Sequence, residues 1–272
     1  MKNNITLAII IVTYNHREYL SGCLQSIKNS AIKVNYRIIV IDNNSFDGTI
    51  KTIPSSLNKS VKIARNKKNL GFARACNIGI NLISADYYLI LNPDIILETD
   101  SISRMIDFLK RNKQAYCAVP VLNNFDGSIQ YSCRRFPGLK ETLLKRTPLR
   151  WLFDLEDVNK YDEKRMRLIS KNVPFRIDWA LGGCVMIKRS VLGKIGLFDE
   201  RFFLYCEDID WFYRLKKANL AAYCFPESIM RHKHLAVSDH KLFSIESYYH
   251  FIGIMKFIVK HFNDILTGQY EL

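Results

Sequence analysis

The sequence predicts an α/β fold in which a mostly parallel central sheet is flanked by helices. Apolar runs at residues 5–12 and 36–41 are continuous, as in strands that are buried on both faces. Segments with apolar residues at helical spacing separate such runs, which is typical of right-handed βαβ crossovers. The 272 residues are 48% hydrophobic, so the chain is long and apolar enough to form one large globule with a full core.

Strands and helices alternate through the first half of the chain. The expected strands are residues 5–12, 36–41, 61–64, 87–91 and 116–121. The expected helices are residues 16–29, 72–83 and 99–111, and the first of them repeats apolar residues at helical spacing from Tyr19 to Ile27. Polar residues follow each of the first three expected strands, and the tripeptide Asn92-Pro93-Asp94 follows the fourth.

The second half is less regular. We expect a hairpin over residues 123–133 that turns at Asp126 and Gly127, a strand over 178–188 interrupted by two glycines, a helix over 207–218, a short strand over 221–225 and a helix over 241–262. Residues 134–172 are rich in Arg and Lys and show the least pattern. The predicted organisation is one globular domain over 1–240, with halves at 1–121 and 122–240, and a C-terminal amphipathic helix or tail over 241–272.

Charge and cysteine content limit the function classes. The formal net charge of +14 suggests an anionic partner such as nucleic acid, a membrane surface or a phosphorylated small molecule, or else only a well-solvated basic surface. The seven cysteines form no Cys-x-x-Cys pair, and they are typical of buried thiols in a reducing compartment. No apolar run has the length of a membrane span or signal peptide. We therefore expect a cytoplasmic protein and leave open contact with a membrane face.

Polar residues follow the predicted strands at the edge where parallel sheets bind ligands. They are Thr13, Tyr14, Asn15, Asp42, the segment 66–74, Asn92 and Asp94. A carboxylate directly after a buried strand is costly unless it is paired or binds a metal, and Mg²⁺ or Mn²⁺ prefers carboxylate and phosphate oxygens. The alternative for Asp94 is a cap on a helix that begins near Leu97. The segment 42–49 could likewise be only a turn rich in Asp and Asn.

The second half has its own candidate residues. Glu207, Asp208 and Asp210 begin the predicted helix, where acidic residues also favour the helix dipole. Three carboxylates in four positions exceed what capping requires, so one of them is a candidate general base. His232 and His234 follow a strand near these acids and are candidate metal ligands, although a lone histidine is more often structural.

An ordered set of motifs carries a family resemblance. It consists of Val12-Thr13-Tyr14-Asn15, Val40-Ile41-Asp42-Asn43-Asn44-Ser45, Asn69-x-Gly71-Phe72, Leu91-Asn92-Pro93-Asp94, Gly182-Gly183, Phe198-Asp199-Glu200-x-Phe202-Phe203 and Glu207-Asp208-x-Asp210. This set resembles the inverting family 2 glycosyltransferases of the GT-A fold, over roughly residues 5–240, and is most similar to bacterial rhamnosyltransferase-like members.

The resemblance implies roles for these residues. Donor binding would fall to Thr13, Tyr14, Asn15, Asp42, Asn44, Asn69, Arg74, Asn92 and Asp94. Acceptor binding would fall to Trp179, which could stack on a sugar, and to Gly182, Gly183, Glu207 and Asp210. Asp208 would be the catalytic base, and Asp94 with His232 or His234 would bind Mg²⁺ or Mn²⁺. The usual Asp-x-Asp is altered here, because its first acid is replaced by Asn92. The lost charge should weaken metal binding, or else leave Asn92 to bind a sugar hydroxyl or the ribose.

The resemblance also implies the partners, and alternatives remain beside it. The donor would be a nucleotide-diphospho-sugar, with dTDP-rhamnose first and a UDP-sugar next, and the acceptor a glycan or a lipid-diphosphate-linked glycan. The basic and apolar segment 134–153 suits an anionic lipid interface or a helical hairpin packed on the core. The helix at 241–262 could pack on the core, form a homodimer or lie on a membrane. The rival functions are a sugar-phosphate nucleotidyltransferase and a non-catalytic binding relative; nucleic-acid binding lacks a recognisable motif.

Overall fold

The computed structural model describes residues 5–57, 60–136, 156–233 and 244–266. Its strands are β1 (Ile5–Thr13), β2 (Tyr36–Asp42), β3 (Val61–Arg65), β4 (Ala85–Leu91), β5 (Ile95–Leu97), β6 (Ala115–Asn123), β7 (Cys133–Arg134), β8 (Phe175–Ile177), β9 (Trp179–Ala180), β10 (Cys184–Lys188) and β11 (Ala221–His232). Its helices are α1 (Leu20–Asn29), α2 (Phe72–Asn81), α3 (Ser101–Arg111), α5 (Glu156–Ser170), α6 (Arg189–Ile195), α7 (Glu207–Lys217), α8 (Ile245–Lys260) and α9 (Phe262–Leu266), with 3₁₀ turns at Thr49–Thr52 and Ser55–Leu57.

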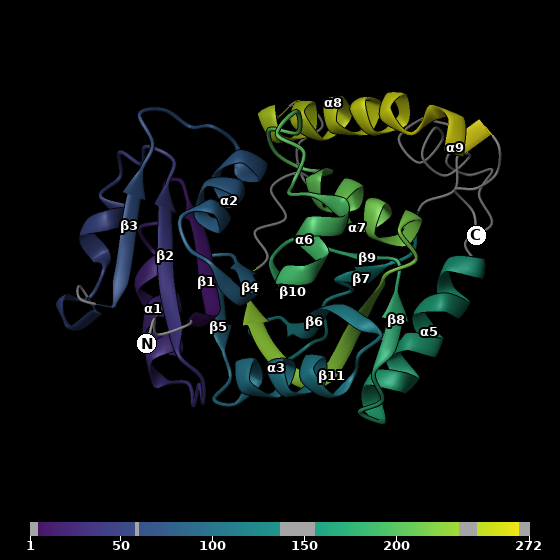
Figure 1. Ribbon diagram of the computed structural model, residues 1–272, viewed down its shortest axis with the longest axis horizontal. Coiled ribbons are helices and arrows are strands. Elements are labelled where there is room, and N and C mark those ends of the chain that lie inside the picture. Colours follow the sequence, from purple (N-terminus) through teal and green to yellow (C-terminus); the bar gives the residue numbers. More distant parts are fainter. Residues whose placement is uncertain (1–4, 58–59, 137–155, 234–243, 267–272) are drawn as a thin grey trace.

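One central sheet organises the described residues, in the order β3-β2-β1-β4-β10-β6-β11-β5 with β8 paired to β11 (Figure 1). The strands from β3 to β4 are parallel, as expected from the alternating first half. In the second half β10 runs antiparallel between β4 and β6, while β11 is parallel to β6. The two halves of the chain therefore share a single mixed sheet.

The sheet is covered by helices on both faces. Leu7, Ile9 and Ile11 of β1 pack with α1 and α3, whereas Ala8 and Ile10 pack with α2, α6 and α7. Successive side chains of a strand point to opposite faces, so an apolar residue is needed at every position. This confirms the inference drawn from the continuous apolar runs.

Three elements differ from the sequence prediction. Ile95–Leu97 is strand β5, paired with the end of β11, so the helix cap suggested for Asp94 is wrong. β11 extends to His232 instead of ending near Phe225. The region that showed the least pattern contains α5, a polar helix without a long apolar stripe.

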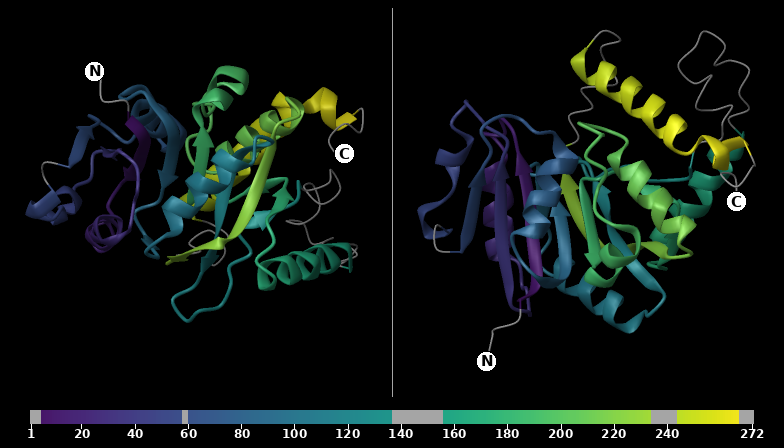
Figure 2. Two further views of the ribbon diagram at one scale, coloured as in Figure 1. Left: turned by 60° about the horizontal axis from the view of Figure 1, so that its bottom comes forward. Right: turned by 45° about the horizontal axis from the view of Figure 1, so that its top comes forward.

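The remaining predictions on organisation have mixed outcomes. The segment after β6 turns at Asp126 and Gly127 through an antiparallel bridge between Asn123 and Ile129, but the strand that follows pairs with β9 rather than β6. All seven cysteines are free thiols in buried positions. Among the described residues, no helix combines the length and the apolar character that crossing a membrane requires. The C-terminal helix packs along the rim of the molecule on the side of α7 (Figure 2).

Candidate functional site

A cleft of about 440 Å³ lies at the carboxyl ends of the central strands. Its walls come from the ends of β1 and β4, the loop before β10, the segment before α7 and the end of β11. The residues that line it include Tyr14, His16, Asn43, Asn69, Gly71, Asn92, Asp94, Gly182, Gly183, Phe203, Tyr205, Glu207, Asp208 and His232. The structure thus brings Asp94, which follows β4, and the first two acids of α7, Glu207 and Asp208, into one cleft.

Asp94 and His232 form a close pair at the floor of this cleft. Oδ2 of Asp94 lies 3.3 Å from Nε2 of His232, and both side chains are almost fully buried. Oδ1 of Asp94 is buried without a hydrogen-bond partner among the described residues. Such a carboxylate is unfavourable unless a cation or donor completes its surroundings.

Gln130 determines which nitrogen of His232 faces Asp94. The side-chain amide of Gln130 donates to the carbonyl of His232 at 2.8 Å, which leaves its Oε1 as the acceptor 2.9 Å from Nδ1 of the same histidine. In a ring that carries its single proton on Nδ1, the lone pair lies on Nε2, the arrangement found in metal-binding histidines. Two electron-rich atoms then face each other, so the pair fits a divalent cation.

The pair supplies only part of a coordination shell. Within the ranges that the structure describes, no group of three His, Cys, Asp or Glu side chains could hold a metal. Mg²⁺ is commonly held by one or two protein ligands together with phosphate oxygens of a substrate. The donor set at Asp94 and His232 fits that kind of site and does not fit a closed structural site.

Gly182 and Gly183 lie between this pair and Asp208. The backbone N–H of Asn92 donates to the carbonyl of Gly183 at 2.8 Å. A Cβ on Gly183 would lie 3.7 Å from Cε1 of His232, and one on Gly182 would lie 3.6 Å from Cβ of Asp208. The two glycines therefore form the cleft floor that joins the candidate metal ligands to the candidate base.

Asp208 is oriented by backbone donors. Gly182 N–H donates to its Oδ2 at 3.1 Å, and Ile209 N–H donates to its Oδ1 at 2.8 Å. Burial raises the pKa of Asp208, against the lowering effect of these two N–H groups. The result is a fixed carboxylate with an increased affinity for protons.

Glu207 lies beside it in a different environment. Burial, together with the neighbouring charge of Asp208, raises the pKa of Glu207 well above its ordinary value. Its Oε2 is buried and has no partner among the described residues.

The two residues before Glu207, Tyr205 and Cys206, both adopt φ of +67°, which non-glycine residues rarely do. The start of α7 is thus held in a strained conformation.

The opposite end of the cleft is built from the loops after β1, β2 and β3. Asn69 Oδ1 accepts from Gly71 N–H at 2.9 Å, and Asn43 Nδ2 donates to the Gly71 carbonyl at 3.1 Å. Gly71 has φ of +84°, and a Cβ there would lie 2.9 Å from Cα of Phe203. A glycine is therefore required where this loop meets the segment before α7.

Several predicted donor residues support these loops without lining the cleft. Thr13 and Asp42 are fully buried, and Asp42 accepts from Ser45 N–H and from Nε of Arg65, both at 2.9 Å. Asn15 accepts from Phe46 N–H at 3.0 Å. Like Asn15, Asn44 adopts a positive φ. Of the predicted donor set, Tyr14, Asn69, Asn92 and Asp94 line the cleft.

The structure places three predicted residues elsewhere. Trp179 is 6% exposed and donates from Nε1 to the Arg135 carbonyl, so it does not reach the cleft to stack on a sugar. Asp210 is fully buried against Arg214, Lys260 and His261, because it points to the opposite side of α7 from Asp208. Arg74 pairs with Glu200 at 3.4 Å outside the cleft. His234 lies outside the described residues.

Sequence reasoning missed other lining residues. His16 comes three residues after the end of β1, and burial lowers its pKa against the raising effect of Asp94 and Asp47. Asn43 stands between Asp42 and Asn44, and Gln130 orients His232 from a distant turn. His16 and Asn43 are polar residues in loops that follow strands, a pattern that indicates the ligand-binding edge of the sheet. Nothing in the sequence points to Gln130.

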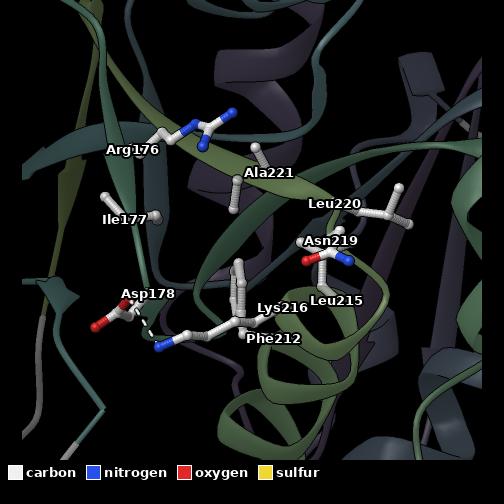
Figure 3. A pocket seen from close by; sticks show the side chains of 10 residues that line it. Arg176, Ile177, Asp178, Phe212, Leu215, Lys216, Asn219, Leu220 and Ala221 are labelled. Carbon is white, nitrogen blue, oxygen red and sulfur yellow. Dashed lines mark ion pairs between the residues drawn. The ribbon is translucent and has the colours of Figure 1, made fainter. Parts of the chain in front are cut away.

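A second cavity, of about 340 Å³, lies at the other end of α7 (Figure 3). Phe212, Leu215 and Lys216 of α7 line it, facing Arg176 to Asp178 (Figure 3). Lys216 and Asp178 form an ion pair across it at 3.8 Å. None of the residues predicted for catalysis or binding lines this cavity.

Comparison with known proteins gives consistent matches. Residues 8–196 match the family described as glycosyl transferase family 2. The chain is 28% identical over 247 residues to an N-acetylglucosaminyl-diphospho-decaprenol L-rhamnosyltransferase of Mycobacterium tuberculosis, covering 84% of this chain and 76% of that protein. It is 28% identical over 234 residues to the rhamnosyltransferase WbbL of Escherichia coli, covering 80% of each.

A solved structure shows the same fold. It is a mannosyltransferase of Pyrobaculum calidifontis in complex with GDP-Man and Mn²⁺, which matches with a TM-score of 0.63 and 14% identity. The match covers 95% of this chain and 65% of the mannosyltransferase chain. At this identity the likeness concerns the arrangement of helices and strands alone.

Proposed function

Because this chain belongs to glycosyltransferase family 2, we propose that it is an inverting, metal-dependent enzyme that moves a sugar from a nucleotide-diphospho-sugar to a lipid-diphosphate-linked glycan. Its fold is of the GT-A type, as the resemblance implied. Two rhamnosyltransferases among the similar proteins favour rhamnose as the sugar and dTDP-rhamnose as the donor. The name of one of them favours a polyprenyl-diphosphate acceptor.

One observation supports this proposal above the others. Asp94 and Asp208 lie in the same cleft on either side of Gly182 and Gly183. Sugar transfer needs a place for the diphosphate and a base for the acceptor hydroxyl within reach of one anomeric carbon. Had the two acids been on opposite sides of the molecule, this mechanism would have no structural basis.

The diphosphate would lie over Asp94 and His232. A divalent cation held there would neutralise the negative charge of the leaving nucleoside diphosphate. Asn92 contributes no charge to this site, and its backbone N–H is already directed to Gly183. Tyr14 and Asn69 would hold the nucleoside end of the donor, since they line the same cleft in the loops after β1 and β3.

Asp208 would take the proton of the acceptor hydroxyl. Its two backbone donors fix the carboxylate, so it would accept the proton without a change of rotamer. The raised pKa of Asp208 makes it a stronger base than an ordinary aspartate, while it stays ionised at pH values above that pKa. The hydroxyl oxygen attacks the anomeric carbon opposite the diphosphate, so a single displacement inverts that centre.

This assignment places the reaction at the inner face of the cytoplasmic membrane. A lipid-linked acceptor has its diphosphate at the bilayer surface, and a protein with a formal net charge of +14 is attracted to anionic headgroups. Residues 137–155, which contain most of the basic and apolar segment singled out in the sequence, lie outside the described residues.

The decisive test is Asp208→Asn. We expect its turnover to fall by about 10²-fold or more, as for loss of a general base, while a nucleoside diphosphate with Mn²⁺ still raises its melting temperature. The matched control is Asp107→Asn, an exposed acid on α3, which should keep wild-type turnover. Purified protein is first incubated with a panel of nucleotide sugars and acceptors to find the active pair. Wild-type turnover in Asp208→Asn would remove this residue from the role of base.

A further inference from the structure

The inner face of α8 is fixed to residues 201–206, the segment that leads into α7. Tyr249 stacks on Phe203 with ring centroids 4.7 Å apart, and a Cβ on Gly253 would lie 3.0 Å from the Tyr205 carbonyl. Lys256 donates to the Arg201 carbonyl at 2.6 Å. Phe257 is buried in the core, and so α8 cannot rotate without breaking these contacts.

The opposite face of α8 is an apolar stripe that none of these contacts covers. Its six large side chains are Ile245, Tyr248, Phe251, Met255, Val259 and, at the start of α9, Phe262; they are between 43% and 72% exposed. They follow one another at steps of three or four residues, which places them on one side of a helix. Figure 1 shows α8 at the rim, with no described strand or helix beyond it. An exposed apolar patch of this kind marks an interaction surface.

The charges beside the stripe are arranged with the cations outward. In the Arg201–Asp199 pair the side chains are 67% and 15% exposed, and in the Lys217–Asp264 pair they are 50% and 14% exposed. Lys260, which contacts Asp199 and Asp210, is again the more exposed partner. In these pairs the acids are less exposed than the cations, so their positive ends are the ones turned toward the solvent near the stripe. That polarity complements an anionic surface.

We propose that the apolar stripe of α8 is a docking surface for an anionic lipid bilayer. The six side chains enter the headgroup region while the outward cations contact lipid phosphates, as in helices that lie in a membrane interface. This inference rests on the proposed function in one respect, namely that a lipid-linked acceptor has its diphosphate at that same surface. Since the inner face of α8 holds the wall of the cleft, docking would bring that wall to the level of the acceptor.

Vesicle flotation tests the docking surface. Full-length protein is mixed with vesicles of phosphatidylcholine, with or without phosphatidylglycerol, at low and high salt. We expect flotation with phosphatidylglycerol vesicles and a loss of binding at high salt. The double variant Phe251→Asp/Val259→Asp should bind at least about tenfold more weakly, because it removes apolar area and adds charge to the stripe.

A matched control separates the stripe from exposed apolar residues in general. Phe125 and Ile63 are also exposed and lie on the turn after β6 and on β3, so Phe125→Asp/Ile63→Asp should float like wild type. Melting temperature and thermal stabilisation by nucleoside diphosphate show that each variant is folded. Equal flotation of the stripe variant and wild type would overturn the proposal, and so would wild-type protein that fails to float.

The stripe could instead pair with a second copy of the chain. Light scattering distinguishes this outcome: a dimer that the stripe variant abolishes, without flotation of wild type, would assign the stripe to self-association and overturn bilayer docking.

Catalysis is measured separately with acceptor in vesicles and acceptor in detergent. We expect the stripe variant to lose transfer only in vesicles. Flotation without any sugar transfer would contradict the proposed function and leave the docking surface in place.

Discussion

Glu207 and Asp208 are adjacent in the chain, yet their carboxyl groups have different surroundings. Asp208 accepts two backbone N–H groups, while one oxygen of Glu207 is buried without a partner among the described residues. An ionised carboxylate is stabilised by such donors and destabilised by burial alone. The arrangement therefore separates the two acids: Glu207 favours the protonated form, and Asp208 is the one equipped to act as an ionised base.

Glu207→Gln tests this separation through the pH dependence of stability. Because the pKa of Glu207 is raised in the folded protein, the folded state holds a proton that the unfolded state releases, and stability is lost as pH rises through the folded pKa. One such proton gives a slope of up to about 1.4 kcal/mol per pH unit. Glutamine cannot ionise, so we expect a flatter profile of urea unfolding in the pH range between the ordinary pKa of glutamate and the raised folded pKa of Glu207.

The control for this measurement is Glu227→Gln, an exposed acid on β11. Its profile should follow wild type, since an exposed glutamate has nearly the same surroundings when folded and unfolded. A Glu207→Gln profile as steep as that of wild type would show that the proton belongs to another group.

At this scale the sequence could predict residue types and strand ends, but not the direction of every side chain. Asp94 follows a buried strand and Asp208 belongs to a distinctive acidic motif, so both were found. Asp210 is only two residues further along α7, which turns it to the other side of the helix and into a buried ion pair. The resemblance implies that Trp179 could stack on a sugar, whereas its strand packs it in the core.

At the scale of elements, α8 supports the strained turn that begins α7. Tyr205 and Cys206 keep their positive φ values under Gly253, whose missing side chain leaves room for Cys206 Sγ at 3.0 Å from the Cβ position. Phe203 lies just before this turn, and its carbonyl accepts from Phe72 N–H at 2.7 Å on the other side of the cleft. A helix remote from the chemistry thereby positions both walls of the site.

Gly253→Leu should show this positioning. A leucine would press on the turn and displace Asp208, and a shift of about 1 Å at a reacting group can cost about 10²-fold in rate. We expect turnover to fall at least about tenfold, measured as kcat at saturating donor and acceptor, with thermal stabilisation by nucleoside diphosphate retained.

Met255→Leu is the matched control, because it puts the same side chain on the outward face of α8. Its turnover with acceptor in detergent should equal that of wild type. A Gly253→Leu enzyme with wild-type kcat would show that the turn keeps its geometry without α8.

Element prediction failed where the local sequence gave too little information. β5 has three residues, too few for a period, and exists because it pairs with the end of β11. β11 itself continues past Pro226 through an irregularity in its pairing with β6, which local propensity does not foresee. Long apolar runs such as β1 and β2 need no such context, because their own composition requires burial on both faces.

At the scale of the whole molecule, the cleft exists because the two halves of the chain share one sheet. β10 lies between β4 and β6, so the strand that follows Gly182 and Gly183 runs beside the strand that ends before Asp94. The sequence indicated two halves but not this insertion, since antiparallel pairing between distant segments leaves no local pattern. A donor bound across the cleft would contact loops from both halves and stabilise the sheet as a unit.

The donor and the cation would meet at the strand ends of this shared sheet. If donor and cation meet at Asp94, each must strengthen the binding of the other by the same factor, because coupling between two ligands is reciprocal. A nucleoside diphosphate at about 100 times its Kd adds about 2.7 kcal/mol to stability, which corresponds to roughly 5 °C or more for a chain of this size. We expect Mn²⁺ and nucleoside diphosphate together to raise the melting temperature by more than the sum of their separate effects. In Asp94→Asn the excess should vanish, whereas in Asp86→Asn, an exposed acid at the other end of β4, it should persist. An undiminished excess in Asp94→Asn would place the cation elsewhere, and the proposed diphosphate site would have to move with it.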